Sequence, residues 1–413
     1  MFLSFRSKYI FFASLLVLSI LLTVFLFRLD NSVAAQEKSS IQNFIVVLKD
    51  TANPQDVANE MARVHGLSVE HVYSKALNGF SAAIPQARLE KIKADGRVQF
   101  VSEDKLVETF IQATPSGISR INASTNLNKG TGIGVAVIDT GIDLTHLDLK
   151  ANIVANYSCI RGKKTGLDDN GHGTHVAGTI AALNNSTGVV GVAPEAKLIA
   201  VKVLNSAGSG TWSSIICGID WVTANAGKYN IKVANMSLGG GGSSDNNCGN
   251  TNNDALHKAI CKSATAGIIY TVAAGNSGAN SSGFVPAAYD DAVITVSALA
   301  DSDGESGGLG AVTSYGLDDT FASFSNFGSV VDLGAPGVSI YSTWKGGGYN
   351  TISGTSMASP HVAGSAALYI KSHPGFSWSQ VRDGLAANAE DLNAGHTDSS
   401  GFHAEPVLQA NSL

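Results

Sequence analysis

The stretch GVAVIDTG, residues 134–141, decides the fold of this chain. Small and apolar residues form a strand that is apolar on both faces, and a carboxylate, Asp139, follows directly before a Thr-Gly turn. Strands of this kind are typical of a parallel sheet that helices cover on both sides. Because such sheets bind ligands at the carboxyl ends of their strands, Asp139 lies where a site is expected.

Apolar strands alternate with helical stretches through the rest of the C-terminal region. Further strands are predicted at 198–204, 233–238, 268–273 and 293–297, and helices at 172–183, 213–222, 254–266, 356–371 and 378–387. This alternation predicts an α/β fold with a doubly wound, mostly parallel sheet.

A smaller domain precedes this region. Its predicted strands lie at 44–48, 69–73, 80–84 and 98–107, and its predicted helices at 54–65 and 85–94. This order is that of the split βαβ, ferredoxin-like α+β arrangement. About 70 residues give only a marginal core, so this domain is expected to depend on a partner for stability. The predicted boundaries are 1–35 for a leader, 36–112 for the small domain and 113–413 for the large one.

The first 35 residues have the pattern of an export signal. Arg6 and Lys8 precede the apolar run Tyr9–Phe27, and the small residues Val33-Ala34-Ala35 offer a cleavage point. Since the run approaches the roughly 20 residues that span a bilayer, an uncleaved anchor at residues 9–27 is the alternative. In either case the positive start stays in the cytoplasm and the rest of the chain is exported.

Charge and cysteine content fit an exported globular protein. The formal net charge of −6 gives no sign of a basic nucleic-acid surface, so no nucleic-acid partner is expected. Four cysteines in an exported chain favour two disulfides, for which three pairings are possible. We expect Cys159–Cys217, which ties a loop to the helix at 213–222, and Cys248–Cys261, which closes a short excursion. Buried free thiols are the alternative.

Two further motifs accompany Asp139. His172 lies in NGHGTHVAG, residues 170–178, and Ser356 lies in SGTSMASPH, residues 353–361; each motif opens a predicted helix. A serine hydroxyl is a poor nucleophile until an imidazole takes its proton, and the imidazole needs a carboxylate to fix its tautomer. The three motifs together therefore predict nucleophilic catalysis by Asp139, His172 and Ser356.

Pro360 marks the start of the last of these helices. It lies four residues after Ser356 and has no N–H to donate to the Ser356 carbonyl, which is tolerable only in a first helical turn. We therefore expect Ser356 at a helix N-terminus, where the dipole and free N–H groups favour negative charge.

Other titratable residues near the motifs are expected to be structural: Asp143, Asp148, His146, His175 and His361. Neither of these aspartates follows directly on the strand, as Asp139 does. A metal pair of His172 and His175 is disfavoured because no His-Glu-x-x-His motif is present.

These motifs resemble those of the subtilisin-like serine proteases, on the proteinase K side of that family, which carry the residues in the order Asp, His, Ser. The resemblance covers nearly everything after Gln42, because residues 36–112 resemble the family's inhibitory propeptide. It implies a secreted, monomeric serine endopeptidase that cleaves proteins and peptides and needs no cofactor for catalysis. It also implies a proenzyme that processes itself, with a propeptide tail near Thr109–Ala113 in the cleft.

The resemblance also implies roles for individual residues. Asn276 would stabilise the oxyanion together with the backbone N–H of Ser356. Substrate would be added as a strand between two edges, with a first pocket walled by small residues; the implied substrate-binding residues are Gly208, Ser209, Gly210, Ser237, Leu238, Gly239, Ala273, Ala274 and Gly275. None of these is acidic, so we expect broad cleavage after apolar or aromatic residues and no obligate preference for Arg or Lys.

The resemblance further implies structural calcium. Asp301, Asp303 and Glu305 alternate along a Gly-rich loop and Asp318-Asp319 follow shortly, and carboxylates so spaced can hold Ca²⁺. A solvated acidic loop is the alternative, so the metal ligands stay open.

A non-catalytic binding protein on the same fold is the alternative function. Such a protein would have lost a member of the catalytic set or the amide at Asn276, whereas all four residues are present here.

Overall fold

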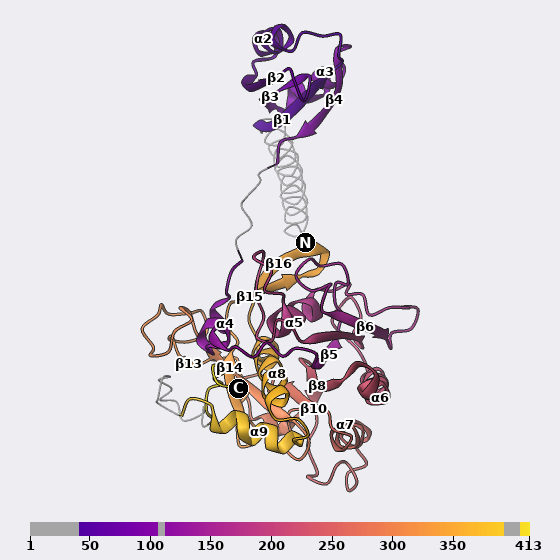
Figure 1. Cartoon of the computed structure of the whole chain (residues 1–413), viewed down its shortest axis with the longest axis vertical. Helices are drawn as coiled ribbons and strands as arrows, with labels where there is room; N and C mark the ends of the chain where they lie inside the picture. The colour runs from indigo at the N-terminus through magenta and orange to yellow at the C-terminus, as the bar shows by residue number, and fades with distance from the viewer. Residues whose placement is uncertain (1–40, 106–111, 392–404) are drawn as a thin grey trace, which may run out of the picture. The chain divides into compact units, whose positions relative to one another are not determined.

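The computed structural model describes residues 41–105, 112–391 and 405–413, and the chain divides into two compact units between Thr109 and Phe110 (Figure 1). The predicted leader, residues 1–35, lies outside the described residues. Within the described ranges, no helix combines the length and the apolar character needed to cross a membrane.

The N-terminal unit has the predicted ferredoxin-like fold. Its antiparallel sheet has the order β2-β3-β1-β4. The elements are β1 (Ile41–Leu48), α2 (Pro54–His65), β2 (Ser68–Tyr73), β3 (Gly79–Pro85), α3 (Gln86–Lys93) and β4 (Val98–Glu103). Alternate residues of β1 and β3, such as Val46, Phe80 and Ile84, are fully buried against the two helices.

The C-terminal unit is built on an eight-stranded sheet with the order β13-β12-β10-β8-β5-β7-β6, in which β14 also pairs with β12. All these pairs are parallel except β12 with β13. The strands are β5 (Gly134–Asp139), β6 (Ile153–Ser158), β7 (Lys197–Lys202), β8 (Ile231–Met236), β10 (Ile269–Ala273), β12 (Ile294–Ala300), β13 (Thr320–Phe321) and β14 (Leu333–Pro336). The predicted α/β class and mostly parallel sheet are confirmed.

Helices cover both faces of this sheet (Figure 1), and β5 shows why its sequence is apolar throughout. Val135 and Val137 pack into the core formed with α5 and α8, whereas Ala136 and Ile138 pack into the core formed with α6 and α7. The helices are α5 (His172–Ala181), α6 (Trp212–Tyr229), α7 (Ala255–Thr265), α8 (Thr355–Ser372) and α9 (Trp378–Ala387).

Several elements were not predicted. Strand β6 lies at the end of the sheet and exposes Val154 and Tyr157, so its sequence lacks the continuous apolar run of the central strands. A hairpin of β15 (Ile340–Trp344) and β16 (Gly348–Ile352) precedes α8, and helix α6 continues seven residues beyond the predicted end at Val222. A short helix, α4 (Ser116–Arg120), opens the unit.

Candidate active site

Asp139 and His172 meet at the carboxyl edge of the sheet. Asp139 ends β5 and is fully buried, whereas His172 is the first residue of α5 and is one quarter exposed. The Nδ1 atom of His172 lies 2.8 Å from Asp139 Oδ1 and 3.0 Å from Oδ2. A carboxylate at Nδ1 fixes the tautomer of the ring and its orientation, which leaves Nε2 available to act as a base.

The start of helix α5 is held by a residue that sequence reasoning missed. Asp168 accepts hydrogen bonds from the N–H groups of Asn170 and Gly171 through one oxygen, and from the N–H and hydroxyl of Thr174 through the other. An acidic residue just before a predicted helix is a capping signal, which could have identified it.

Glycine lets this helix approach the strand. A Cβ on Gly173 would lie 2.2 Å from the Gly141 carbonyl oxygen and 3.2 Å from the Asp139 side chain. A residue with a side chain at Gly173 would therefore push α5 away from the end of β5.

Ser356 is the second residue of α8, as expected, but Pro360 is the sixth and lies inside the helix, not in its first turn. Since Pro360 cannot donate to the Ser356 carbonyl, that oxygen needs another partner; the Ser237 hydroxyl donates to it at 2.8 Å. The Ser356 hydroxyl in turn donates to the Ser237 carbonyl at 3.3 Å, which is a long hydrogen bond. Among the described residues it makes no hydrogen bond to His172, and in free enzymes such bonds are often long and tighten only when substrate binds.

Asn276 lies beside this turn. Its Oδ1 accepts from the N–H and the hydroxyl of Thr355, both at 2.9 Å, which fixes the amide so that Nδ2 is the free end. A Cβ built on Gly354 would lie 3.5 Å from Asn276 Nδ2 and 3.7 Å from the Ser356 backbone nitrogen. Two donors therefore lie within 4 Å of one point, and the absence of a side chain at Gly354 keeps that point open.

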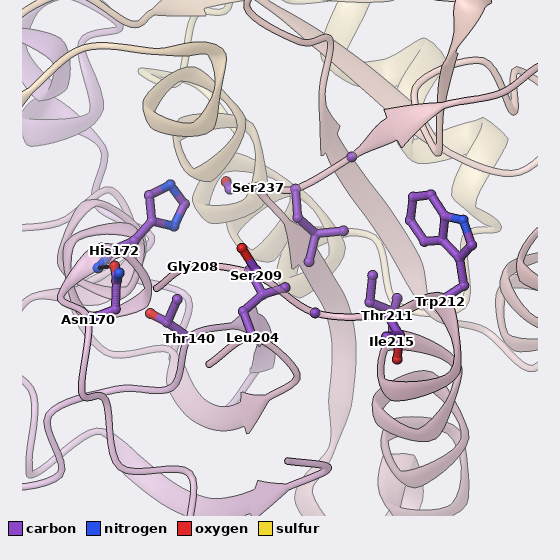
Figure 2. A pocket seen from close by; sticks show the side chains of 13 residues that line it. Thr140, Asn170, His172, Leu204, Gly208, Ser209, Thr211, Trp212, Ile215 and Ser237 are labelled. Carbon is purple, nitrogen blue, oxygen red and sulfur yellow. Dashed lines mark hydrogen bonds between the residues drawn. The ribbon is translucent and has the colours of Figure 1, made fainter. Parts of the chain in front are cut away.

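A cavity of about 650 Å³ runs along the site (Figure 2). His172 lies at one end and Trp212 at the other, and the predicted strand-binding edges, 208–210 and 237–239, both line it.

A second cavity, of about 250 Å³, begins where Leu238 and Gly239 line both cavities. The predicted pocket residues Gly239, Ala273, Ala274 and Gly275 line it together with Phe284, Val285, Asn276 and Ser356. No charged side chain is among its lining residues. The predicted substrate-binding residues thus line two cavities that share Leu238 and Gly239, and Ser356 lines the smaller one. Trp212 and Phe284 line these cavities without having been predicted.

Neighbouring carboxylates favour the protonated form of His172. Burial alone would lower the pKa of the ring, but the charge of Asp139 and its hydrogen bond, with a further contribution from Asp168, outweigh burial and raise the pKa. An imidazolium formed when His172 takes a proton is therefore stabilised by two carboxylates.

The residues predicted to be structural lie outside this arrangement. Asp143 accepts from Thr145 and from the Gly347 N–H, whereas Asp148 accepts from the Tyr349 hydroxyl and the Val189 N–H. The histidines bond to backbone oxygens: His146 to Gly348, His175 to Ile340 and His361 to Met357. Burial lowers the pKa of both His175 and His361 to about 4, so both rings are neutral at pH 7.

Two disulfides are present. Cys159 is joined to Cys217, in helix α6, and Cys248 is joined to Cys261, in helix α7; these are the two pairs expected from the sequence.

Three backbone carbonyl oxygens surround the side-chain amide of Gln112. Its Nε2 atom lies 2.6 to 3.2 Å from the carbonyl oxygens of Leu183, Thr187 and Val189. Asp148 contacts the same loop, through the Val189 N–H and Asn185. The oxygen and nitrogen of a Gln amide can be exchanged by a flip, which would turn the Gln112 oxygen towards the three carbonyl oxygens. These oxygens, together with the nearby Asp148 carboxylate, are the type of ligand that Ca²⁺ prefers. This group could not be predicted from the sequence, because any residue type can supply a backbone carbonyl.

Comparison with known proteins agrees with this geometry. Residues 130–402 match the subtilase family, and residues 43–110 match the peptidase inhibitor I9 family. The chain therefore belongs to the subtilase family and is a serine endopeptidase with an I9 propeptide domain, as the sequence motifs had implied.

Its relatives include several subtilisins. Subtilisin NAT from Bacillus subtilis subsp. natto and subtilisin E from Bacillus subtilis (strain 168) are each 40% identical over 400 residues, covering 94% of this chain and 95% of theirs. Among solved structures, a cold adapted subtilisin-like serine proteinase is 36% identical with a TM-score of 0.57, covering 71% of this chain and 97% of its own. The placement on the proteinase K side of the family stays a prediction.

Proposed function

We propose that this protein is a secreted, self-processing endopeptidase in which Asp139, His172 and Ser356 form the catalytic triad. The observation that carries the proposal is the 2.8 Å contact between His172 Nδ1 and the buried Asp139 carboxylate. This contact orients the ring at the end of the larger cavity, which Ser237 also lines. Ser237 and Ser356 are joined by two hydrogen bonds, in each of which the hydroxyl of one residue donates to the backbone carbonyl of the other.

In this mechanism Ser356 Oγ attacks the peptide carbonyl while His172 Nε2 takes its proton. Asp139 keeps the ring in the tautomer that can do so and stabilises the imidazolium. Negative charge develops on the carbonyl oxygen, and Asn276 Nδ2 and the Ser356 N–H stabilise it. The imidazolium then protonates the leaving amine, and water releases the acyl group by the same steps.

The cavities support a substrate preference. A peptide strand between the edges at 208–210 and 237–239 would place the residue before the cut bond in the cavity of about 250 Å³. Because glycine, alanine and Phe284 line it and no charged side chain does, cleavage follows apolar or aromatic residues. Profiling with a peptide library tests this; dominant cleavage after Arg or Lys would contradict it.

The N-terminal unit serves as an intramolecular inhibitor that is cut off. The contacts of Gln112 to the loop at 183–189, and the backbone bond from the Ala113 N–H to the Gly188 carbonyl, tie these residues to the catalytic unit. They favour a cut before Gln112, upstream of the end predicted from the sequence. The remaining part of the predicted inhibitory tail, residues 109–111, lies outside the described residues.

Structural calcium would be held by the shell around Gln112. Leu183, Thr187 and Val189 would supply backbone oxygens, and Asp148 a carboxylate. Calcium there would fasten the new N-terminal segment to the catalytic unit and take no part in the chemistry.

Release of the exported chain as a secreted protein follows if the leader at residues 1–35 is removed after Ala35. Sequencing the N-terminus of the exported protein tests this; a start at Met1 would establish the membrane-anchored form, with residues 9–27 as the anchor.

Comparing two serine variants tests the catalytic assignment. Wild-type chain should shorten by its propeptide and react with a fluorophosphonate, whereas Ser356→Ala should do neither. Ser353→Ala removes a hydroxyl three residues away, whose oxygen accepts from the Ser339 N–H, and should behave as wild type. Processing of Ser356→Ala in the absence of another protease would contradict self-maturation.

A further inference from the structure

A third cavity, of about 330 Å³, begins at Trp212, which lies at the end of the larger cavity away from His172 (Figure 2). Trp212 lines both of these cavities, and the third cavity also shares Gly241 and Val285 with the smaller one. Among the described residues that line the third cavity, Asp254 is the one that carries a charge. The third cavity therefore continues the substrate-binding surface and differs from it in charge.

The segment 237–243 leads from Ser356 to this cavity. Ser237 is bonded to Ser356 and lines the larger cavity, whereas residues 241–243 line the third. A substrate strand beside this segment advances by about 3.3 Å per residue, as the segment itself does. If the residue before the cut bond lies opposite Ser237, the fifth or sixth residue before that bond lies opposite Gly241 or Gly242. This count rests on the proposed function, because it takes 237–239 as a substrate-binding edge.

The carboxylate of Asp254 is held in a fixed position at the wall of the third cavity. Its Oδ1 caps helix α7 by accepting from the N–H groups of Leu256 and His257, and its Oδ2 accepts from the Tyr289 hydroxyl at 2.5 Å. Burial and the Asp254 carboxylate raise the pKa of Tyr289, so this hydroxyl stays protonated and continues to donate. A carboxylate fixed in this way needs little further ordering to bind a partner.

No cation of the described residues is paired with Asp254. Lys258 lies one turn further along α7, but it donates to Asn250 Oδ1 at 3.1 Å and forms no ion pair with Asp254. The Asp245 carboxylate lies close enough to Tyr289 to contribute to the rise in its pKa, so it adds a second negative charge on this side of the cavity. The half-buried Asp254 is therefore available to a positive charge that enters the cavity.

Trp212 supplies an aromatic wall for the same cavity. Its side chain is 39% exposed, and its ring packs on Gly240, where a Cβ would lie 2.9 Å from Cζ2. The absence of a side chain at Gly240 thus lets the ring lie against the backbone between the larger and the third cavity. Trp rings attract the charged heads of Lys and Arg. The third cavity therefore combines a carboxylate and an aromatic ring, two groups that together recognise a cationic side chain.

We propose that the third cavity is a distal substrate subsite, which binds a Lys or Arg side chain at the fifth or sixth position before the cut bond. The Asp254 carboxylate pairs with the charged head of that side chain, and Trp212 packs against its apolar stem. An acidic side chain at the same position is repelled by Asp254. This selectivity is separate from the preference for an apolar or aromatic residue next to the cut bond, which depends on the smaller cavity.

The test compares the mature wild-type enzyme with Asp254→Asn and Asp220→Asn. Asn caps a helix about as well as Asp, so Asp254→Asn removes the charge and keeps the start of α7. Asp220, an exposed residue of α6 that lines none of the three cavities, provides the matched control. Each enzyme receives fluorogenic peptides with one cleavable bond after Phe, which differ only in having Lys, Gln or Glu at the fifth or the sixth position before that bond.

The quantity compared is the ratio of kcat/KM between the Lys and Gln peptides. The Gln peptide corrects each enzyme for its folded fraction, so a loss of stability does not change the ratio. We expect wild type and Asp220→Asn to prefer Lys over Gln about five- to tenfold at one of the two positions, to disfavour Glu, and to lose most of this preference at high salt. In Asp254→Asn the ratio should fall below about twofold.

Two kinds of failure can be distinguished. A ratio near one in wild type, an unchanged ratio in Asp254→Asn, or an equal fall in Asp220→Asn would overturn the distal subsite and leave the proposed function intact. If wild type cleaved none of the peptides, the proposed function would be wrong, and the distal subsite with it.

Discussion

The sheet edge at Asp139 and the acidic loop at residues 301–319 both bury aspartates, but the two regions differ in the hydrogen-bond donors that these aspartates receive. Asp139 receives the Thr140 N–H and the His172 ring, and Asp168 receives four donors from the start of α5. In the loop, Asp301 keeps a buried oxygen without a donor. The fully paired carboxylates hold the His172 ring and the start of α5 in place, whereas the loop leaves one buried carboxylate oxygen unpaired. The difference lies in the donors supplied, because both regions bury the same type of side chain.

The largest effect is expected from removing the charge at the catalytic edge. Asp139→Asn keeps the shape of the side chain but presents an amide to His172, which favours the wrong tautomer. By analogy with other triads, kcat should fall about 10⁴-fold. The matched control is Asp143→Asn, because Asp143 is also buried beside this strand but accepts from Thr145 and Gly347 instead. Steady-state kinetics of both should separate them; equal losses would remove Asp139 from the triad.

Removing a charge beside the acidic loop should lower the free energy of unfolding and leave kcat unchanged. Arg120→Met removes a fully buried guanidinium that pairs with Asp319 at 2.6 Å and with Glu390 at 3.0 Å. Leaving buried carboxylates uncompensated costs about 3–5 kcal/mol. Arg382→Met, which breaks partly exposed pairs with Asp332 and Asp383, should cost less than about 1 kcal/mol.

Denaturant unfolding of the inhibited enzymes measures both arginine variants. A loss in Arg120→Met no larger than that in Arg382→Met would show that the Arg120 cluster is not structurally important. A large loss of kcat in the folded Arg120→Met enzyme would show that the two regions are coupled.

The same contrast explains what could be predicted from the sequence. Strand β5 with Asp139, and the helix starts at His172 and Ser356, were predictable because each combines an apolar pattern with a residue that directly follows or opens it. The start of α8 follows from local chemistry in the same way, although Pro360 lies inside this helix and not in its first turn.

The burial of Asp301 follows no local pattern. It depends on packing between the loop and segments far away in the sequence: a Cβ on Gly304, for example, would lie 3.1 Å from the Ser116 carbonyl oxygen. The carbonyl oxygens around Gln112 were unpredictable for a related reason, because they belong to the backbone of a loop. Strand β6, at the edge of the sheet, was not predicted because it lacks a continuous apolar run.

A smaller catalytic effect is expected from the oxyanion donor. Asn276→Ala removes the side chain whose orientation Thr355 fixes. Loss of one such donor costs about 10²–10³ in kcat, the size known for a subtilisin, with little change in KM. Ser282→Ala, at an exposed position of the same segment that lines neither cavity, should leave both constants near those of wild type. A change in KM alone would indicate that Asn276 binds substrate and not the transition state.

The smallest effect should come from Asp168, and it concerns pH. His172 acts as a base only when neutral, so activity falls as pH drops through its pKa, which Asp139 and Asp168 raise. Asp168→Asn removes one of these charges and keeps a side-chain oxygen for the helix start; the pKa should fall, and the acid limb of kcat/KM should move to lower pH. Asp169→Asn is the matched control, because Asp169 pairs with Lys202 and Lys163. A limb that stays in place in Asp168→Asn, or moves by the same amount in Asp169→Asn, would show that Asp168 only holds the helix and does not act on the charge of His172.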